Sequence, residues 1–534
     1  MRVVGLVLWA GCAGAGVPPV DTSDTAPVQE TDAVACDPAV VGTWETLGEG
    51  YVRTWCSPCH AASLSGDARG GAPEGVDFDS LENVRRWAEA IAASAVGVDG
   101  AAPRMPPGGG PSSEDVAAFA AWLACEAPGT PEPADPCAVA SVDPVDRTLA
   151  SADEVAAFCA EANTVGGNLT VATDAPIDCL CDVYGDVTVT GAVTTLDAPR
   201  LRGIGGALRL GVPGLRTVAL PALRGVSGAL DLSGAGDLVA FDVSALRDVA
   251  GDLWVEGDVG LEALVLPELA SVGGEVRLVD VTSLKTVSMP RLLDVGGRVT
   301  LSGLGSWDAW DDFASLTTVG GDLVVAHNPA LPSVEGLDQL TSVGGDLVFA
   351  DLGALEALSG LRGLATVAGS VRVVDNPVLR GVEGFLGLAV TDKALEVARN
   401  PSLVAVDGFA ALERVGVEGD WVYGDHRLAF YDLPSLTRLP RFEALVRVGG
   451  FEVLRADALD TLDFPVLLIV DRDLAVVQVG GLRTLAGLSA VRRIGTDVAI
   501  TGNPMLTAMD VQAFVDGVGE GNIGGTVTAQ NNGP

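Results

Sequence analysis

Apolar side chains recur at helical spacing in the first part of the chain. Along the stretch 43–55 they occupy positions i, i+3, i+7 and i+11, as Trp44, Leu47, Tyr51 and Trp55. The stretch 81–95 repeats this spacing, and a third stretch starts with a capping box formed by Ser112 and Asp115. Because residues 36–125 contain no alternating β-branched run, the pattern predicts a small all-α domain there.

A different pattern fills the chain from residue 137 onward. Pairs of glycines return every 23 or 24 residues, starting at Gly273, Gly296, Gly320 and Gly344. Each pair precedes a short run in which apolar and polar residues alternate, and leucines follow at fixed offsets. About sixteen copies of this repeat run from residue 167 to residue 525.

A repeat of this length has one apolar face and cannot close a core by itself, so stacked copies must bury those faces together. The sequence therefore predicts an all-β leucine-rich solenoid over residues 137–534, a β-helix of about sixteen rungs. Glycine is expected at tight corners that need a positive φ. Asparagines recur after strands, and their amides are expected to bond neighbouring turns: Asn328, Asn376, Asn400 and Asn503.

The repeat resembles the receptor L-domain, the leucine-rich β-helix of receptor ectodomains and many bacterial surface proteins. The chain differs from the receptor members in having no cysteine beyond Cys181 and in running on for more turns. A protein or glycan is the expected kind of ligand for the solenoid, and the resemblance does not identify it.

The first residues are typical of a secretory signal peptide over residues 1–11. The Ala-Gly that precedes Cys12 resembles the lipobox of bacterial lipoproteins, which implies a lipidated Cys12 and an outer-membrane or cell-surface location. The alternative is an ordinary signal peptide cut near residues 13–16, which would leave the protein in the periplasm. Residues 12–35 predict a disordered tether, and the four prolines of residues 126–136 predict a linker.

The net charge of the chain limits the kinds of partner that we expect. The chain has 32 Lys and Arg against 71 Asp and Glu, a formal net charge of −39, so nucleic acid is not expected as a partner. Lys285 and Lys393 are the only lysines, and no other run reaches the ~18 apolar residues that span a bilayer. Membrane contact is therefore expected only through the lipid anchor.

One motif in the helical part predicts a cofactor or redox site. Cys56, Cys59 and His60 form C-x-x-C-H, in which two thiols one helical turn apart can attach to the haem vinyl groups while the imidazole binds iron. The preceding Trp55 gives W-C-x-P-C, which also resembles the thioredoxin redox site. That fold needs a buried strand before the motif, and residues 43–55 have a helical period instead. A structural disulfide or a zinc knuckle are further alternatives, although no second pair of ligands is nearby.

A second axial ligand for haem is expected from Met105, which stands in a loop rich in proline and glycine rather than on a helix face. Residues 36–125 thus resemble class I cytochrome c. This resemblance implies thioethers at Cys56 and Cys59, His60 as the proximal ligand and Met105 as the distal one. It also implies that the first and last helices cross, so that Tyr51 or Leu47 contacts Phe119 or Trp122.

Six cysteines remain when Cys12, Cys56 and Cys59 are set aside, an even number in an exported protein. A bond between Cys36 and Cys125 would tie the ends of the helical domain. The other four lie at the first turns of the solenoid and allow three pairings: Cys137, Cys159, Cys179 and Cys181.

No Ser/His/Asp set, histidine cluster or phosphate loop predicts an enzyme. We therefore expect an exported, membrane-anchored mono-haem cytochrome that transfers one electron to or from an unidentified redox partner. The competing hypothesis is a cell-surface recognition or adhesion protein in which haem is secondary.

Overall fold

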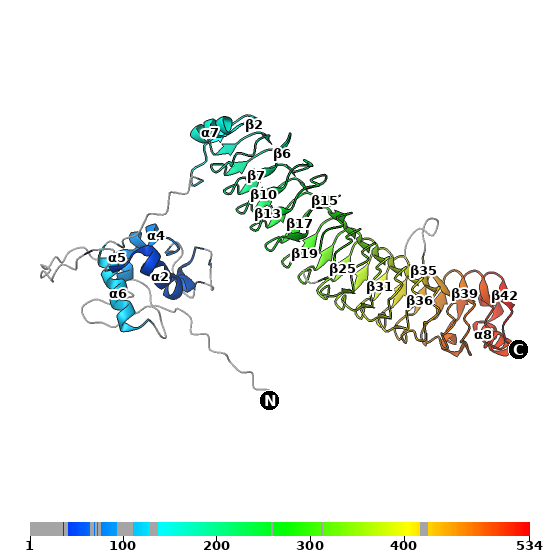
Figure 1. Ribbon diagram of the computed structural model, residues 1–534. Coiled ribbons are helices and arrows are strands. Elements are labelled where there is room, and N and C mark those ends of the chain that lie inside the picture. Colours follow the sequence, from blue (N-terminus) through cyan, green and yellow to red (C-terminus); the bar gives the residue numbers. More distant parts are fainter. Residues whose placement is uncertain are drawn as a thin grey trace. The chain divides into compact units, whose positions relative to one another are not determined.

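The computed structural model describes two parts of the chain in detail, apart from short gaps. The described residues are 36, 41–62, 64, 69, 72, 76–92, 111–125, 127, 137–257, 260–310, 313–416 and 426–533. The predicted signal peptide, Cys12, the tether, the linker and Met105 lie outside them. The chain divides into two compact units, Met1–Ala138 and Val139–Pro534 (Figure 1).

The described elements of the first unit are all helical. They are η1 (Trp44–Gly48, a π-helical turn), α2 (Glu49–Trp55), α3 (Ser57–His60), α4 (Leu81–Arg86), α5 (Ala88–Ile91) and α6 (Ser113–Ala124). The Ser112 side chain accepts a hydrogen bond from the Asp115 N–H, so the predicted cap of the last helix is confirmed. The helix expected over 81–95 is interrupted at Trp87, whose φ of −107° and ψ of 11° end α4.

The first and last helices pack closely together, a contact that the resemblance to class I cytochrome c implied. The rings of Tyr51 and Phe119 are stacked with centroids 3.9 Å apart. Gly48 lies against Trp122, and a Cβ at Gly48 would come within 2.5 Å of that ring, so only glycine permits this approach. A disulfide of 2.07 Å joins Cys36 to Cys125 and confirms that expected bond.

The second unit is a β-solenoid with three faces of parallel strands (Figure 1). Its long face is a 16-stranded sheet with one strand per turn, which agrees with the about sixteen copies expected. Its strands are β1 (Val142–Asp143), β3 (Thr164–Val165), β5 (Asp182–Val183), β8 (Gly203–Ile204), β11 (Gly225–Val226), β14 (Asp248–Val249), β17 (Ser271–Val272), β20 (Asp294–Val295), β22 (Thr318–Val319), β25 (Ser342–Val343), β28 (Thr366–Val367), β31 (Val390–Thr391), β34 (Arg414–Val415), β36 (Arg447–Val448), β38 (Ile469–Val470) and β40 (Arg493–Ile494).

The second face consists of longer strands in the same order along the chain. They are β2 (Arg147–Leu149), β4 (Leu169–Val171), β6 (Val187–Val189), β9 (Leu208–Arg209), β12 (Leu230–Asp231), β15 (Leu253–Glu256), β18 (Val276–Val279), β21 (Val299–Ser302), β23 (Leu323–Ala326), β26 (Leu347–Ala350), β29 (Val371–Val374), β32 (Leu395–Ala398), β35 (Arg427–Tyr431), β37 (Gly450–Leu454), β39 (Leu474–Val477), β41 (Val498–Thr501) and β42 (Val527–Gln530). Alternate residues point inward: Leu253 and Val255 of β15 are fully buried, whereas Trp254 between them is partly exposed.

The third face is broken into short sheets. They comprise β7 (Thr195–Asp197), β10 (Thr217–Ala219) and β13 (Ala240–Asp242), then β16 (Ala263–Val265) and β19 (Thr286–Ser288), then β24 (Ser333–Val334), β27 (Ala357–Leu358), β30 (Gly381–Val382) and β33 (Ala405–Val406). The three faces enclose one continuous core of valine, leucine and isoleucine with a few aromatic residues.

The repeated glycine pairs are needed for a reason other than the one the sequence suggested. None of the pairs that start at Gly273, Gly296, Gly320 and Gly344 has a positive φ. A Cβ at Gly320 would instead overlap the carbonyl oxygen of Gly296 on the preceding turn, and Gly344 stands in the same relation to Gly320. The expectation of positive φ was wrong for these pairs, because the limit is the close approach of stacked backbones.

Asparagine side chains do bond neighbouring turns, as expected. Asn328 is fully buried, accepts from the Leu304 N–H at 2.9 Å and donates to the Leu301 carbonyl at 2.9 Å. Asn376, Asn400 and Asn503 make equivalent bonds. These bonds satisfy buried backbone groups that the corner would otherwise leave unpaired.

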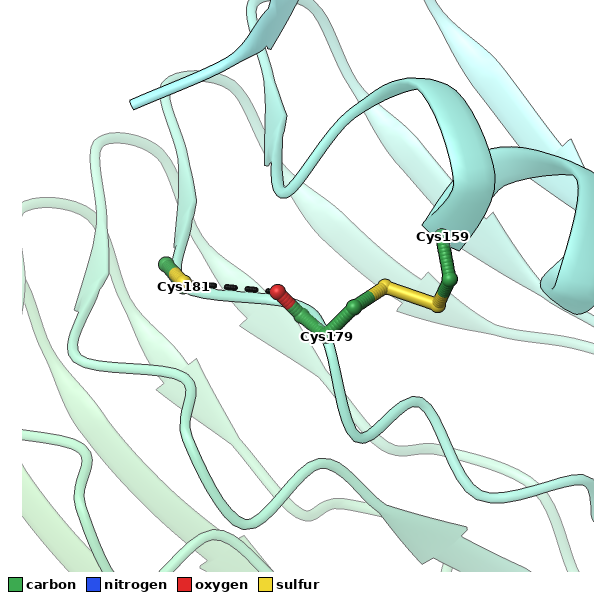
Figure 2. Close-up of a disulfide and its surroundings, with 3 residues drawn as sticks. All are labelled: Cys159, Cys179 and Cys181. Carbon is green, nitrogen blue, oxygen red and sulfur yellow. Dashed lines mark hydrogen bonds between the residues drawn. A yellow bond between two sulfur atoms is a disulfide. The ribbon is translucent and has the colours of Figure 1, made fainter. Parts of the chain in front are cut away.

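Helices lie at the two ends of the solenoid. Helix α7 (Ala152–Glu161) buries Val155 and Phe158 at the first turns, and α8 (Ala508–Val518) lies at the last turns together with the short η4 (Ala486–Leu488) and η5 (Glu520–Asn522). Figure 2 shows the disulfide that ties Cys159 of α7 to Cys179. Cys137 and Cys181 are also disulfide-bonded, and the Cys181 sulfur lies 3.3 Å from the Cys179 carbonyl oxygen. None of the described helices is long and apolar enough to cross a membrane.

Candidate functional site

The C-x-x-C-H motif forms the junction of two helices. Cys56 ends α2, and its carbonyl oxygen accepts from the N–H groups of Cys59 and His60 at 3.1 and 3.0 Å. Pro58 is tolerated because it lies in the first turn of α3, where a missing N–H breaks no helical hydrogen bond. The motif therefore adopts the single helical turn that the sequence predicted for the two cysteines.

His60 is held on both sides by a segment that follows it in sequence. Its Nδ1 lies 2.8 Å from the carbonyl oxygen of Val76, and its ring stacks on Phe78 with centroids 4.4 Å apart. A carbonyl can only accept, so Nδ1 must donate and Nε2 keeps its lone pair. An imidazole fixed in this tautomer by a backbone carbonyl is suited to bind a metal through Nε2.

The buried side chain of Arg69 holds the same segment by hydrogen bonds. The residue is 3% exposed, and its guanidinium donates to the carbonyl oxygens of Ala61 at 3.0 Å and Val76 at 3.2 Å. It also donates to the carbonyls of Leu64 and Ala72 and forms an ion pair of 2.8 Å with Asp77. The Val76 carbonyl thus accepts from both His60 and Arg69.

The two thiols of the motif differ in state. Cys56 is a partly buried free thiol, and burial raises its pKa to about 11. Cys59 takes part in a disulfide. A sulfur in a disulfide cannot also form a thioether, so haem attachment at Cys59 requires this bond to be reduced first. A protonated Cys56 is also a poor nucleophile, which counts against a thioredoxin-like role for it.

A hollow opens beside the motif. It is lined by Trp44, Glu49, Val52, Arg53, Ser57, Phe78 and Asp79. Its apolar side is formed by rings and a valine, and Phe78 belongs both to this hollow and to the packing of His60. Through Phe78 this apolar wall lies next to the His60 imidazole.

The described residues bring together Cys56, Cys59 and His60 but contain no group of three or more His, Cys, Asp and Glu side chains that could hold a metal ion. A single imidazole is enough for haem, whose ring supplies the other nitrogens, and it is too few for zinc. Met105, the expected distal ligand, lies outside the described residues.

Sequence reasoning missed Arg69, Val76 and Phe78. The only signal was the run of glycine and proline between residues 70 and 75, which indicates a loop after the motif. Neither a buried arginine nor the carbonyl that binds a histidine can be recognised from residue type.

Comparison with known proteins adds little to this description. No family model matches the chain, and no curated protein matches it. Among solved structures, a leucine-rich repeat protein from Eubacterium ventriosum is 9% identical, and the match covers 52% of this chain and 78% of that one with a TM-score of 0.13. The strand pairing of the second unit itself defines it as a leucine-rich β-solenoid.

Proposed function

We propose that the first unit is a mono-haem c-type cytochrome that transfers single electrons. The observation that carries the proposal is His60, placed directly after two cysteines one turn apart and held with Nδ1 on the Val76 carbonyl. The crossing of the first and last helices at Tyr51, Phe119 and Gly48 supports the resemblance to class I cytochrome c.

The residues of the unit would act as follows. Haem supplies reversible one-electron chemistry at its iron. The thiols of Cys56 and Cys59, the latter once its disulfide is reduced, would attach the ring, and the Nε2 of His60 and the sulfur of Met105 would bind the iron. The Val76 carbonyl and the Phe78 ring hold the imidazole in one orientation.

Export is part of the proposal. The disulfides Cys36–Cys125 and Cys159–Cys179 are favoured in an oxidising compartment outside the cytoplasm. A lipid on Cys12 would anchor the chain at the outer membrane or cell surface, and the solenoid would bind or display a partner there. The Cys12→Ser variant should then leave the membrane fraction with its fold unchanged, whereas equal membrane association would contradict the anchor.

The decisive experiment is a haem stain on a denaturing gel after expression with cytochrome c maturation enzymes. Covalent haem should stay with the chain, and the Cys56→Ser/Cys59→Ser variant should lose it. A matched control is Cys36→Ser/Cys125→Ser, which removes a disulfide of the same unit and should keep the stain. A colourless wild-type protein would refute the cytochrome.

The competing recognition hypothesis is favoured by the size of the solenoid, whose long sheet alone has 16 strands. A colourless protein that still captures a ligand would support it. The dithiol alternative instead requires rapid alkylation of Cys56 at neutral pH, which the raised pKa of that thiol opposes.

A further inference from the structure

A hollow lies on the outer surface of the long sheet, across strands β5, β8, β11 and β14. We call it the glycine hollow, and the residues that line it include Asp182, Tyr184, Gly203, Gly225 and Asp248. Its volume is about 370 Å³, which lies within the range of ligand sites in proteins. The glycine hollow is therefore large enough for a small ligand or for part of a chain molecule.

The glycine hollow exists because two successive turns lack an outward side chain. Gly203 and Gly225 occupy the register position that holds Asp248 on the next turn and Ser271 on the turn after it. Neither glycine has a positive φ. A Cβ at Gly225 would meet its nearest atom, the Asp248 carbonyl oxygen, at an ordinary 3.8 Å. The fold would thus accept a side chain at Gly225, so the backbone does not explain its absence.

A carboxylate stands at each end of this floor. A Cβ at Gly203 would come within 3.1 Å of the Asp182 Oδ1, which shows that this carboxylate reaches over the glycine. Asp248 accepts from the Ser271 hydroxyl through Oδ1 at 2.8 Å, which leaves its Oδ2 for a ligand. The strands that carry the two aspartates are three turns apart, or about 14 Å. Two well-separated hydrogen-bond acceptors therefore border the glycine hollow.

An exposed tyrosine completes the lining. Tyr184 is 58% exposed and is the only aromatic residue among the exposed large apolar side chains of the described ranges. The matching position holds Gly166 on the turn before and Gly205 on the turn after. No side chain of its own row therefore covers the Tyr184 ring, and its face is available to a ligand.

These surroundings fit a peptide or a cation less well than a sugar. Strands β8 and β11 are paired on both sides, so the floor offers no free backbone edge to which a peptide could add as a strand. Burial raises the pKa of Asp182 while Arg202 opposes that rise, so a positive charge already lies near this carboxylate. The two carboxylates are also too far apart to act together on one cation, since charges are screened beyond about 8 Å at physiological salt.

We propose that the glycine hollow binds a neutral oligosaccharide. A sugar ring would pack its apolar face on the Tyr184 ring, and sugar hydroxyl groups would donate to the carboxylates of Asp182 and Asp248. The inference rests on the binding role proposed above for the solenoid and names the chemical class of its ligand. It does not depend on haem.

The test is isothermal titration calorimetry of the full chain with three neutral sugars, cellohexaose, maltohexaose and mannohexaose, and with hexalysine. We expect at least one of the neutral sugars to bind and hexalysine not to bind. Tyr184→Ala should weaken the binding about tenfold because it removes the ring, whereas Tyr184→Phe should keep most of it. Gly225→Leu should fill the glycine hollow and weaken the binding at least about tenfold.

The matched control is Thr318→Leu, which places the same side chain at the same register position of β22, outside the glycine hollow. It should bind the sugar as the wild type does. Absence of binding for all three neutral sugars, stronger binding of hexalysine, unchanged binding in Tyr184→Ala, or equal loss in the control would each overturn the proposal. Should Gly225→Leu lower the melting temperature, the exposed Tyr184→Ala still decides. The haem stain should be the same in all these variants, so this proposal and the cytochrome can fail separately.

Discussion

At the scale of single residues, Arg69 links the chemistry of the first unit to its packing. Its guanidinium is buried among the carbonyls of Ala61, Leu64, Ala72 and Val76 and beside the Asp77 carboxylate. The planar fork of arginine suits this task, because it donates in several fixed directions at once. The segment after the motif is thereby fastened next to His60.

Arg69→Gln should destabilise the first unit by about 3–5 kcal/mol, because it leaves the Asp77 charge and several carbonyls without their partner. Tryptophan fluorescence during urea unfolding of the full chain would measure this. The exposed Arg53→Gln serves as the control and should change little. If both variants unfold at the same urea concentration, Arg69 does not hold the segment.

The raised pKa of Cys56 should make the stability of the first unit depend on pH. Burial favours the protonated thiol in the folded state and raises its pKa to about 11. A raised folded pKa means that the folded state keeps the proton that the unfolded chain releases. The stability of the haem-free first unit should therefore fall as the pH rises from the ordinary thiol pKa toward about 11. Thermal melts across this range should show a smaller fall in Cys56→Ser, and an unchanged pH dependence would contradict the prediction.

At the scale of secondary-structure elements, the solenoid depends on how closely its turns stack. Asparagine amides bond the corners, and glycines stand where one backbone passes over the next. Two glycines differ in this respect: Gly225 lies within strand β11 of the long sheet, and Gly320 directly follows strand β22. Gly320 lies under the Gly296 carbonyl, whereas Gly225 has room for a Cβ.

Gly320→Ala should consequently destabilise the solenoid by about 1–3 kcal/mol, because the turns must move apart to admit the methyl group. Gly225→Ala is the matched variant and should be tolerated. Circular dichroism during thermal unfolding would compare them. Equal melting temperatures of the two variants would contradict the prediction, because the spacing between turns would then adapt to the methyl group without cost.

At the scale of the whole molecule, each of the two units has a core and a disulfide of its own. Cys36 and Cys125 enclose nearly all of the described first unit, with a sequence separation of 89. Cys159 and Cys179 are separated by only 20 residues and secure the first turns of the solenoid.

Removing each disulfide as a serine pair should affect only its own unit. In the chain-entropy account, loss of Cys36–Cys125 costs about 4.6 kcal/mol and loss of Cys159–Cys179 about 3.3 kcal/mol. Calorimetry of the full chain should show one transition lowered in each variant and the other kept. Simultaneous loss of both transitions would mean that the units unfold together.

The sequence by itself determined the architecture of this protein. A 23- or 24-residue period with leucines at fixed offsets admits only stacked turns, because no single repeat can bury its apolar face. The capping residue Ser112 located the start of α6. The motif of Cys56, Cys59 and His60 could also be recognised from the sequence, because the local spacing of its residues fixes its geometry.

Tertiary structure decided what depends on contacts between distant residues. Val76 and Phe78 reach His60 only through the fold of the intervening segment, and Arg69 owes its burial to that same segment. The repeated glycines looked like corner residues until the stacked backbones showed the approach that excludes a Cβ.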